Sequence, residues 1–269
     1  MKKTAHERRL DALEMVKASN SGHIGGSMGC MDILAVLYYK IIDVKKIINA
    51  APDRDRFILS KGHCAEALYA VFADRGIISR AALKTFAAFD SPLAGHPSKK
   101  IPGVEIATGA LGHGLSVGAG IGIGLKADNI TADIYVLTGD GELAEGSVWE
   151  AAMFAAKYKL DNLIAVVDRN KLQISGGTED VMPLEDLSAK FKAFGWECKI
   201  CDGHDPGELI KALTENRPVL KPIVVIAETI KGFGSRVTEN KAEWHHRVPD
   251  DIEFEQIKSD LIKRRDSFG

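Results

Sequence analysis

The sequence predicts an α/β protein in which a parallel β-sheet is flanked by helices on both faces. Residues 133–140 (DIYVLTGD) and 162–170 (NLIAVVDRN) are apolar runs rich in β-branched residues, and the segment between them, VWEAAMFAAKYKL, is typical of a helix. This order is that of a βαβ unit. Because neither run alternates with polar residues, we expect parallel strands buried between helices.

The rest of the chain continues this alternation. Before the βαβ unit we expect a helix at 4–19, a glycine- and serine-rich loop at 19–29, a helix at 31–41, a strand at 56–60, and helices near 63–75 and 80–89. After it we expect helices at 184–195, 205–216 and 250–265, and strands at 196–201 and 221–230. Since there is no internal repeat or Pro-rich linker, we expect one domain over residues 1–269.

The composition favours a globular protein that binds small molecules. The chain has 269 residues, 45% of them hydrophobic, and a formal net charge of -2. This charge gives no basic field for nucleic acid or for an anionic membrane, so we expect neither as a partner. The apolar run at 33–42 is too short to span a membrane, and the charged amino terminus is not a secretory signal. We therefore expect a cytoplasmic protein.

The four cysteines are too few for a disulfide framework in a chain of this length. Cys198 and Cys201 have CxxC spacing, but they lie in a predicted strand, where residues three apart face opposite ways. No second pair completes a zinc site. We expect these cysteines to be structural.

Two polar side chains follow neighbouring strands of the βαβ unit. Asp140 lies in a Gly-Asp-Gly turn after the first strand, and Asn170 ends the second. Carboxyl ends of parallel strands share one edge of a sheet, where ligands bind. Their oxygens, with a main-chain carbonyl, suit Mg²⁺, or Ca²⁺ or Mn²⁺, and Gly141 leaves room and an amide for phosphates. The Gly-Asp-Gly turn alone is also common in plain strand-to-helix connections.

The spacing of these residues points to a known family. An asparagine thirty residues after Gly-Asp-Gly resembles the thiamine diphosphate motif. Other segments resemble transketolase blocks in transketolase order, over roughly residues 10–250: SGHIGGSMG (21–29), RDRFILSKGH (54–63), GHP (95–97), TGALGHG (108–114) and EWHHRVP (243–249). The chain is similar to the part of transketolases that grips the diphosphate, which implies the thiamine-diphosphate-binding fold.

The resemblance implies site residues as well as a fold. The metal ligands would be Asp140, Asn170 and the main-chain oxygen of Leu172, and the cofactor contacts would be His63, Gly109, Ala110, Leu111, Gly141, Asn170 and His246. By the same resemblance, His23, His96 and His246 are the catalytic residues that hydrogen-bond the sugar, because neutral imidazole both donates and accepts. His245 competes with His246 for its role.

Other polar residues are assigned by the same comparison. His113 stands where the family has glutamine and is left without a role, and we expect His6 and His204 to be structural. Glu145 and Glu150 align with carboxylates that lie between two copies of the enzyme in transketolases, although a solvated helix start explains them equally well.

The sequence also departs from the family pattern. SGHIGGSMG lacks two prolines that the family has, Ala110 replaces another proline, Lys61 replaces an asparagine, and GHP is not followed by glutamate. We expect these changes to leave cofactor binding intact, while the acceptor sugar stays undefined.

The resemblance implies an enzyme in two chains. Transketolases transfer a two-carbon ketol unit from a ketose to an aldose, and a separate domain holds the aminopyrimidine ring of thiamine diphosphate. No such segment follows residue 250, so we expect an N-terminal subunit that needs a C-terminal partner, with two copies of each chain. The alternatives are a truncated chain, half of a deoxyxylulose-phosphate synthase or oxo-acid dehydrogenase, a Rossmann dehydrogenase, and a non-catalytic nucleotide- or metal-binding module.

Overall fold

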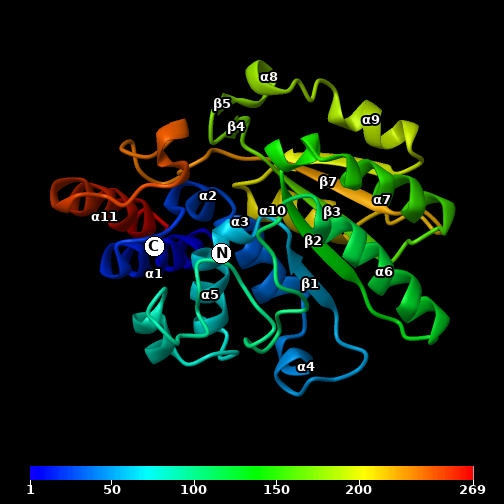
Figure 1. Cartoon of the computed structure of the whole chain (residues 1–269), viewed down its shortest axis with the longest axis horizontal. Helices are drawn as coiled ribbons and strands as arrows, with labels where there is room; N and C mark the ends of the chain where they lie inside the picture. Colours follow the sequence, from blue (N-terminus) through cyan, green and yellow to red (C-terminus); the bar gives the residue numbers. More distant parts are fainter. Residues whose placement is uncertain (269) are drawn as a thin grey trace.

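A five-stranded parallel sheet forms the centre of the computed structural model, which describes residues 1–268. Its strands lie in the order β1 (Arg56–Leu59), β2 (Ile134–Gly139), β3 (Leu163–Arg169), β7 (Ile223–Glu228) and β6 (Glu197–Asp202) (Figure 1). Each adjacent pair is parallel. The predicted parallel sheet and its βαβ unit are therefore confirmed.

Helices cover both faces of the sheet (Figure 1), as predicted. One face carries α6 (His113–Ala127), α7 (Gly146–Lys157) and α9 (Leu187–Ala193). The other packs against α1 (Lys2–Ser19), α3 (Met31–Val36), α5 (Ala65–Asp74) and α10 (Pro206–Thr214), and α11 (Asp251–Asp266) lies on α1. Alternate residues of β3 enter opposite cores, because successive strand side chains point to opposite faces: Ile164 packs on the α1 side and Ala165 on the α6 side.

Short elements connect these layers. They are α2 (Ile24–Gly29), the π-helical turn η1 (Leu37–Ile41), α4 (Val44–Ile48), the 3₁₀ turns η2 (Gly62–Cys64), η3 (Arg80–Thr85), η4 (Gly141–Ala144) and η5 (Ala242–His245), the hairpin strands β4 (Leu172–Gln173) and β5 (Gly176–Gly177), and α8 (Thr178–Val181). Among residues 1–268, no helix combines the length and the apolar character that a membrane crossing requires.

Two sequence predictions about helices were wrong. The segment 19–29 is not a loop throughout, because residues 24–29 form α2 and are all buried, so tertiary packing overrides their weak helix propensity. The helix expected at 80–89 is only the 3₁₀ turn η3, and Ala87 beyond it has a φ of +55°. The helix expected at 31–41 forms, but it changes to a π turn after Val36.

The glycines of α6 allow close packing, as the sequence suggested. A Cβ on Gly118 would lie 2.6 Å from Cγ2 of Val136 on β2, so only glycine lets the helix approach the sheet this closely. The two cysteines of β6 enter different hydrophobic cores, Cys201 in one and Cys198 at the edge of the other. Both are free thiols, in agreement with a structural role.

Candidate active site

Asp140 and Asn170 meet at the carboxyl ends of β2 and β3, as predicted. Both are buried, with 1% and 6% of their surface exposed. The Asp140 Oδ2 accepts a hydrogen bond from the Lys171 amide at 2.5 Å, and the Asn170 Oδ1 accepts one from the Leu172 amide at 3.0 Å. The Asp140 carboxylate therefore contacts the turn that carries Asn170 and Leu172.

The chemistry of these residues fits a hard divalent cation. Burial raises the pKa of Asp140 and the Asp168 carboxylate adds to this effect, while the amides of Lys171 and Gly141 and the Arg169 guanidinium, 3.3 Å from the Asp140 Oδ2, oppose it. The predicted ligands are all oxygens: a carboxylate, a carboxamide and the main-chain carbonyl of Leu172. Residues 1–268 contain no cluster of three or more His, Cys, Asp and Glu that could hold a metal, and the predicted set includes only one such residue.

The half-buried Gly141 has a hydrogen-bond partner for its amide within the same turn. The amide donates a hydrogen bond of 2.8 Å to the Asp140 Oδ1. A Cβ on Gly141 would lie 3.0 Å from Cβ of Gln173, so glycine relieves a tight contact with the β4–β5 hairpin. The 3₁₀ turn η4 separates Asp140 from α7, and the amino end of α7 therefore begins several residues later, at Gly146.

Glu142 is a buried carboxylate that the sequence analysis missed. It accepts hydrogen bonds from the Gly112 amide at 2.9 Å and the Gly139 amide at 3.0 Å, and from the Ser60 hydroxyl. It thereby joins the ends of β1 and β2 to the turn that precedes α6. The predicted cofactor contacts Gly109, Ala110 and Leu111 lie in this turn.

The Gly109 turn lies against His96. Gly109 has a φ of +135°, and a Cβ there would lie 2.7 Å from Cδ2 of His96. Only glycine combines this backbone conformation with so close an approach. A predicted cofactor contact and a predicted sugar contact are therefore neighbours in space.

A buried ion pair lies beneath the site. The Lys61 ammonium donates to Asp168, which also accepts from the Thr229 hydroxyl and, at 3.3 Å, from the Asn170 side-chain amide. Burial lowers the pKa of Lys61, but the Asp168 carboxylate and the thiols of Cys64 and Cys30 together outweigh burial and raise this pKa well above its usual value. This ion pair links the residue after β1 to β3 and, through Thr229, to the end of β7.

The structure brings five of the motif histidines together. His23 lies at the centre of the cluster, and its ring centroid is 4.5 Å from that of His246, 5.3 Å from His63, 5.7 Å from His245 and 6.0 Å from His96. These residues come from segments that are far apart in the sequence. All predicted histidine site residues therefore occupy one cluster.

His23 and His245 are neutral at physiological pH. Burial, followed by the nearby His63, lowers the pKa of His23 to about 4. Burial and the Lys231 ammonium lower the pKa of His245 to about 3. The Nδ1 of His23 is buried and has no hydrogen-bond partner in the described residues, which is unusual for a buried polar atom.

His245 and His246 occupy different positions. The Nδ1 of His245 is 3.0 Å from the Lys231 Nζ, which donates to the Leu172 carbonyl at 3.4 Å, and its ring stacks on His63 at 5.0 Å. His246 is exposed and approaches His23 instead. Lys231 therefore connects His245 to the carbonyl of Leu172, one of the predicted metal ligands.

The remaining polar residues are outside the cluster. His113 is exposed, and its Nδ1 lies 3.2 Å from the Ala110 carbonyl at the start of α6. Glu145 and Glu150 are both exposed near the start of α7, which is compatible with either interpretation of them. His6 on α1 is buried beside the rings of Phe233 and Phe268, in agreement with a structural role.

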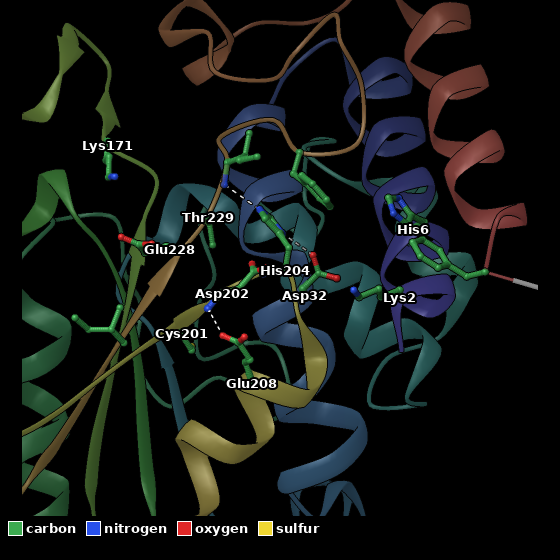
Figure 2. Close-up of a pocket in the computed structure, with 14 residues that line it drawn as sticks. Lys2, His6, Asp32, Lys171, Cys201, Asp202, His204, Glu208, Glu228 and Thr229 are labelled. Atoms are coloured by element: carbon green, nitrogen blue, oxygen red, sulfur yellow. Dashed lines mark hydrogen bonds and ion pairs between the residues drawn. The ribbon is translucent and has the colours of Figure 1, made fainter.

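A large pocket lies beside this site rather than at it. It has a volume of about 830 Å³ beyond the ends of β6 and β7, and it shares Lys171 and Thr229 with the site (Figure 2). His204 stands in its wall, where its Nδ1 contacts Asp32 at 2.9 Å and its Nε2 accepts from the Ile230 amide at 2.9 Å (Figure 2). Both nitrogens are satisfied, as expected for a structural histidine.

The fold and site together define a class of protein. A parallel sheet with Asp140 and Asn170 at two neighbouring strand ends, together with a cluster of histidines, is the arrangement expected of the thiamine-diphosphate-binding fold. Residues 1–268 match the family model of the transketolase thiamine diphosphate binding domain. The chain belongs to the transketolase family, which sets aside the Rossmann dehydrogenase and the nucleotide-binding module.

Curated relatives include proteins of similar length. The chain is 43% identical to an apulose-4-phosphate transketolase subunit of Phocaeicola vulgatus, over 97% of this chain and 93% of that protein. It is 39% identical to a 6-deoxy-6-sulfo-D-fructose transketolase subunit of the genus Clostridium, over 87% of this chain and 86% of that protein. It is also 39% identical to human transketolase, of which it spans only 42%.

Solved transketolases have the same fold over a similar share. A transketolase from Pichia stipitis has a TM-score of 0.87 and 33% identity, over 97% of this chain and 40% of that one. A transketolase from Campylobacter jejuni has a TM-score of 0.85 and 31% identity, over 98% of this chain and 45% of that one. The chain thus corresponds to less than half of a single-chain transketolase.

Proposed function

We propose that the chain is the N-terminal subunit of a transketolase that transfers a two-carbon ketol unit from a ketose to an aldose. The observation that carries this proposal is the position of the histidine cluster beside Asp140, Asn170 and Leu172. Two relatives named as transketolase subunits, of which the chain spans 93% and 95%, support an enzyme built from two kinds of chain.

In this proposal the chain holds the diphosphate end of thiamine diphosphate. Asp140, Asn170 and the Leu172 carbonyl bind Mg²⁺, or Ca²⁺ or Mn²⁺ in its place, and the cofactor contacts come from His63, Gly141, Asn170 and the turn of Gly109, Ala110 and Leu111. When bound, the cofactor supplies the electron sink for carbon–carbon bond cleavage. The contact between His245 and Lys231 supports His245, rather than His246, as the histidine on the diphosphate side.

In this proposal the sugar is bound by His23, His96 and His246. Their imidazoles hydrogen-bond the hydroxyl and carbonyl oxygens and move protons at these atoms. The unpaired Nδ1 of His23 and its lowered pKa support this role, because a neutral ring both accepts and donates.

The partner subunit supplies the pyrimidine-binding domain. We propose two copies of each chain, with Glu145 and Glu150 between the copies, in the cytoplasm. The names of the relatives include a ketose phosphate and a sulfonated ketose, and Pichia stipitis transketolase structures hold fructose 6-phosphate and sedoheptulose 7-phosphate. We therefore propose a ketose donor with an anionic terminus.

Calorimetric titration tests the cofactor assignment. Thiamine diphosphate is titrated into the chain with Mg²⁺ and with EDTA, and NAD and ATP serve as comparison ligands. The proposal predicts binding of thiamine diphosphate only with the metal, and no binding of the other two. Tight binding of NAD or ATP, with none of thiamine diphosphate, would contradict it.

A further inference from the structure

Glu66 is a fully buried carboxylate behind the histidine cluster. It lies in the first turn of α5, and its side chain is 0% exposed. Its Oε1 accepts a hydrogen bond from the His23 amide at 2.7 Å, and its Oε2 accepts one from the Ser27 hydroxyl at 2.8 Å. One carboxylate oxygen therefore binds His23, the residue that precedes α2, and the other binds Ser27 within α2.

Burying the charged form of this carboxylate costs free energy. Burial raises the pKa of Glu66 to about 7, although the hydrogen bond from the His23 amide opposes this effect. Among the described residues, no Lys, Arg or His forms an ion pair with it. The thiol of Cys64 on η2 and the phenol of Tyr69 on α5 are its titratable neighbours, with His23 across the contact. Its hydrogen bonds to α2 are therefore its main compensation.

The segment that Glu66 holds has little stiffness of its own. α2 has six residues, IGGSMG, three of which are glycines, and the side chain of its N-cap residue, His23, makes no capping hydrogen bond. Gly22 gives Glu66 space, since a Cβ there would overlap the Oε1. The backbone of His23 is thus fixed from α5, because α2 itself is short and rich in glycine.

We infer that Glu66 is a positioning residue for His23, which it holds toward the centre of the histidine cluster through the His23 amide and the Ser27 hydroxyl. The inference rests on the proposed function insofar as His23 contacts the sugar. The hydrogen bonds of Glu66 to the His23 amide and the Ser27 hydroxyl do not depend on that function. Loss of both acceptors would release the turn at His23 and move its ring relative to His96 and His246.

Two variants separate this role from simple packing. Glu66→Gln keeps the shape of the side chain, and its amide oxygen can accept from the His23 amide while its NH₂ donates to Ser27. Glu66→Ala removes both acceptors. In the chain alone, we expect Glu66→Ala to speed hydrogen exchange of the His23 amide by roughly tenfold or more, and to move the His23 pKa, measured by NMR, from about 4 toward the ordinary value of 6.5. Glu66→Gln should behave like the wild type.

The assembled enzyme gives a second readout. With the partner subunit, Glu66→Ala should lower kcat/KM for the ketose about tenfold while the thiamine diphosphate affinity stays within about twofold, and Glu66→Gln should restore turnover. Ser27→Ala removes only one of the two hydrogen bonds, and it replaces Glu66→Ala in these measurements if Glu66→Ala does not fold. It should change the same quantities in the same direction, by a smaller amount.

Two results would overturn the inference: unchanged His23 exchange and titration in Glu66→Ala and Ser27→Ala, or an equal loss in Glu66→Gln and Glu66→Ala. If the wild-type assembly transfers no ketol unit, the proposed function fails. The NMR measurements on the chain alone then still decide whether Glu66 positions His23.

Discussion

The Lys231 ammonium lies 3.0 Å from the Nδ1 of His245, and it also donates to the Leu172 carbonyl at 3.4 Å. His246, the next residue, is exposed and faces His23. Two adjacent histidines therefore point to two different parts of the candidate site. This difference makes their roles separable by experiment.

His245→Ala should weaken thiamine diphosphate binding about tenfold or more, because it removes a hydrogen-bonding ring on the diphosphate side. His246→Ala should leave cofactor affinity within about threefold and lower turnover instead. Calorimetry and steady-state kinetics on the two variants distinguish these effects. The opposite pattern would return the diphosphate role to His246.

Asp140→Ala should abolish metal-dependent cofactor binding, with a loss of affinity above about 100-fold, because the only carboxylate of the ligand set is removed. Glu255→Ala, which removes an exposed carboxylate on α11, is the matched control and should bind like the wild type. Titration of thiamine diphosphate with and without Mg²⁺ measures both. Full affinity in Asp140→Ala, or in excess chelator, contradicts the metal assignment.

His23→Ala and His96→Ala should each lower turnover of the assembled enzyme roughly ten- to a hundredfold, which corresponds to the loss of a hydrogen bond of about 1 to 3 kcal/mol. The melting temperature should change little, since His96 is exposed and His23 lies at the amino end of a short helix. His113→Ala is the control, because His113 is exposed outside the cluster. Wild-type kinetics in both variants would make these histidines structural.

Acid should destabilise the chain through His6. Burial, followed by Arg9, lowers its pKa from 6.5 to about 3. Between pH 6.5 and pH 3, His6 is therefore protonated in the unfolded chain and neutral in the folded chain. The stability contributed by neutral His6 is present above pH 6.5 and is lost as the pH falls toward 3. Relative to His6→Gln, the wild type should lose melting temperature between pH 7.5 and pH 5. Parallel curves for the two proteins would contradict this, and His113→Gln provides the exposed control.

The sheet was predictable because β2 and β3 are long apolar runs whose alternation with helices leaves few topologies. The placement of Asp140 and Asn170 at the same edge of the sheet followed from the same pattern, since both residues stand at the ends of neighbouring strands. α2 was missed because its glycines are typical of loops, and only its complete burial in the folded chain makes it helical.

The supporting contacts could not be read from local sequence. Glu66 and His23 are 43 residues apart, Glu142 and Ser60 are 82 apart, and Lys61 and Asp168 are 107 apart. No spacing rule connects residues over such distances, because their approach depends on how the layers pack. The sequence indicated no role for these polar residues, beyond the fact that they lie in or near motifs that resemble those of the family.

The central claim is that this chain is one half of an active site. In the proposed function, it supplies the metal ligands, the diphosphate contacts and the histidines that bind the sugar, and the partner supplies the contact to the aminopyrimidine ring. The most direct measurement is ketol transfer between fructose 6-phosphate, or another anionic ketose, and an aldose, with thiamine diphosphate and Mg²⁺ present. The chain alone should show no transfer, and activity should appear when a separate chain carrying the pyrimidine-binding domain is added, reaching its maximum at an equal ratio of the two. Robust transfer by this chain in isolation would contradict the account.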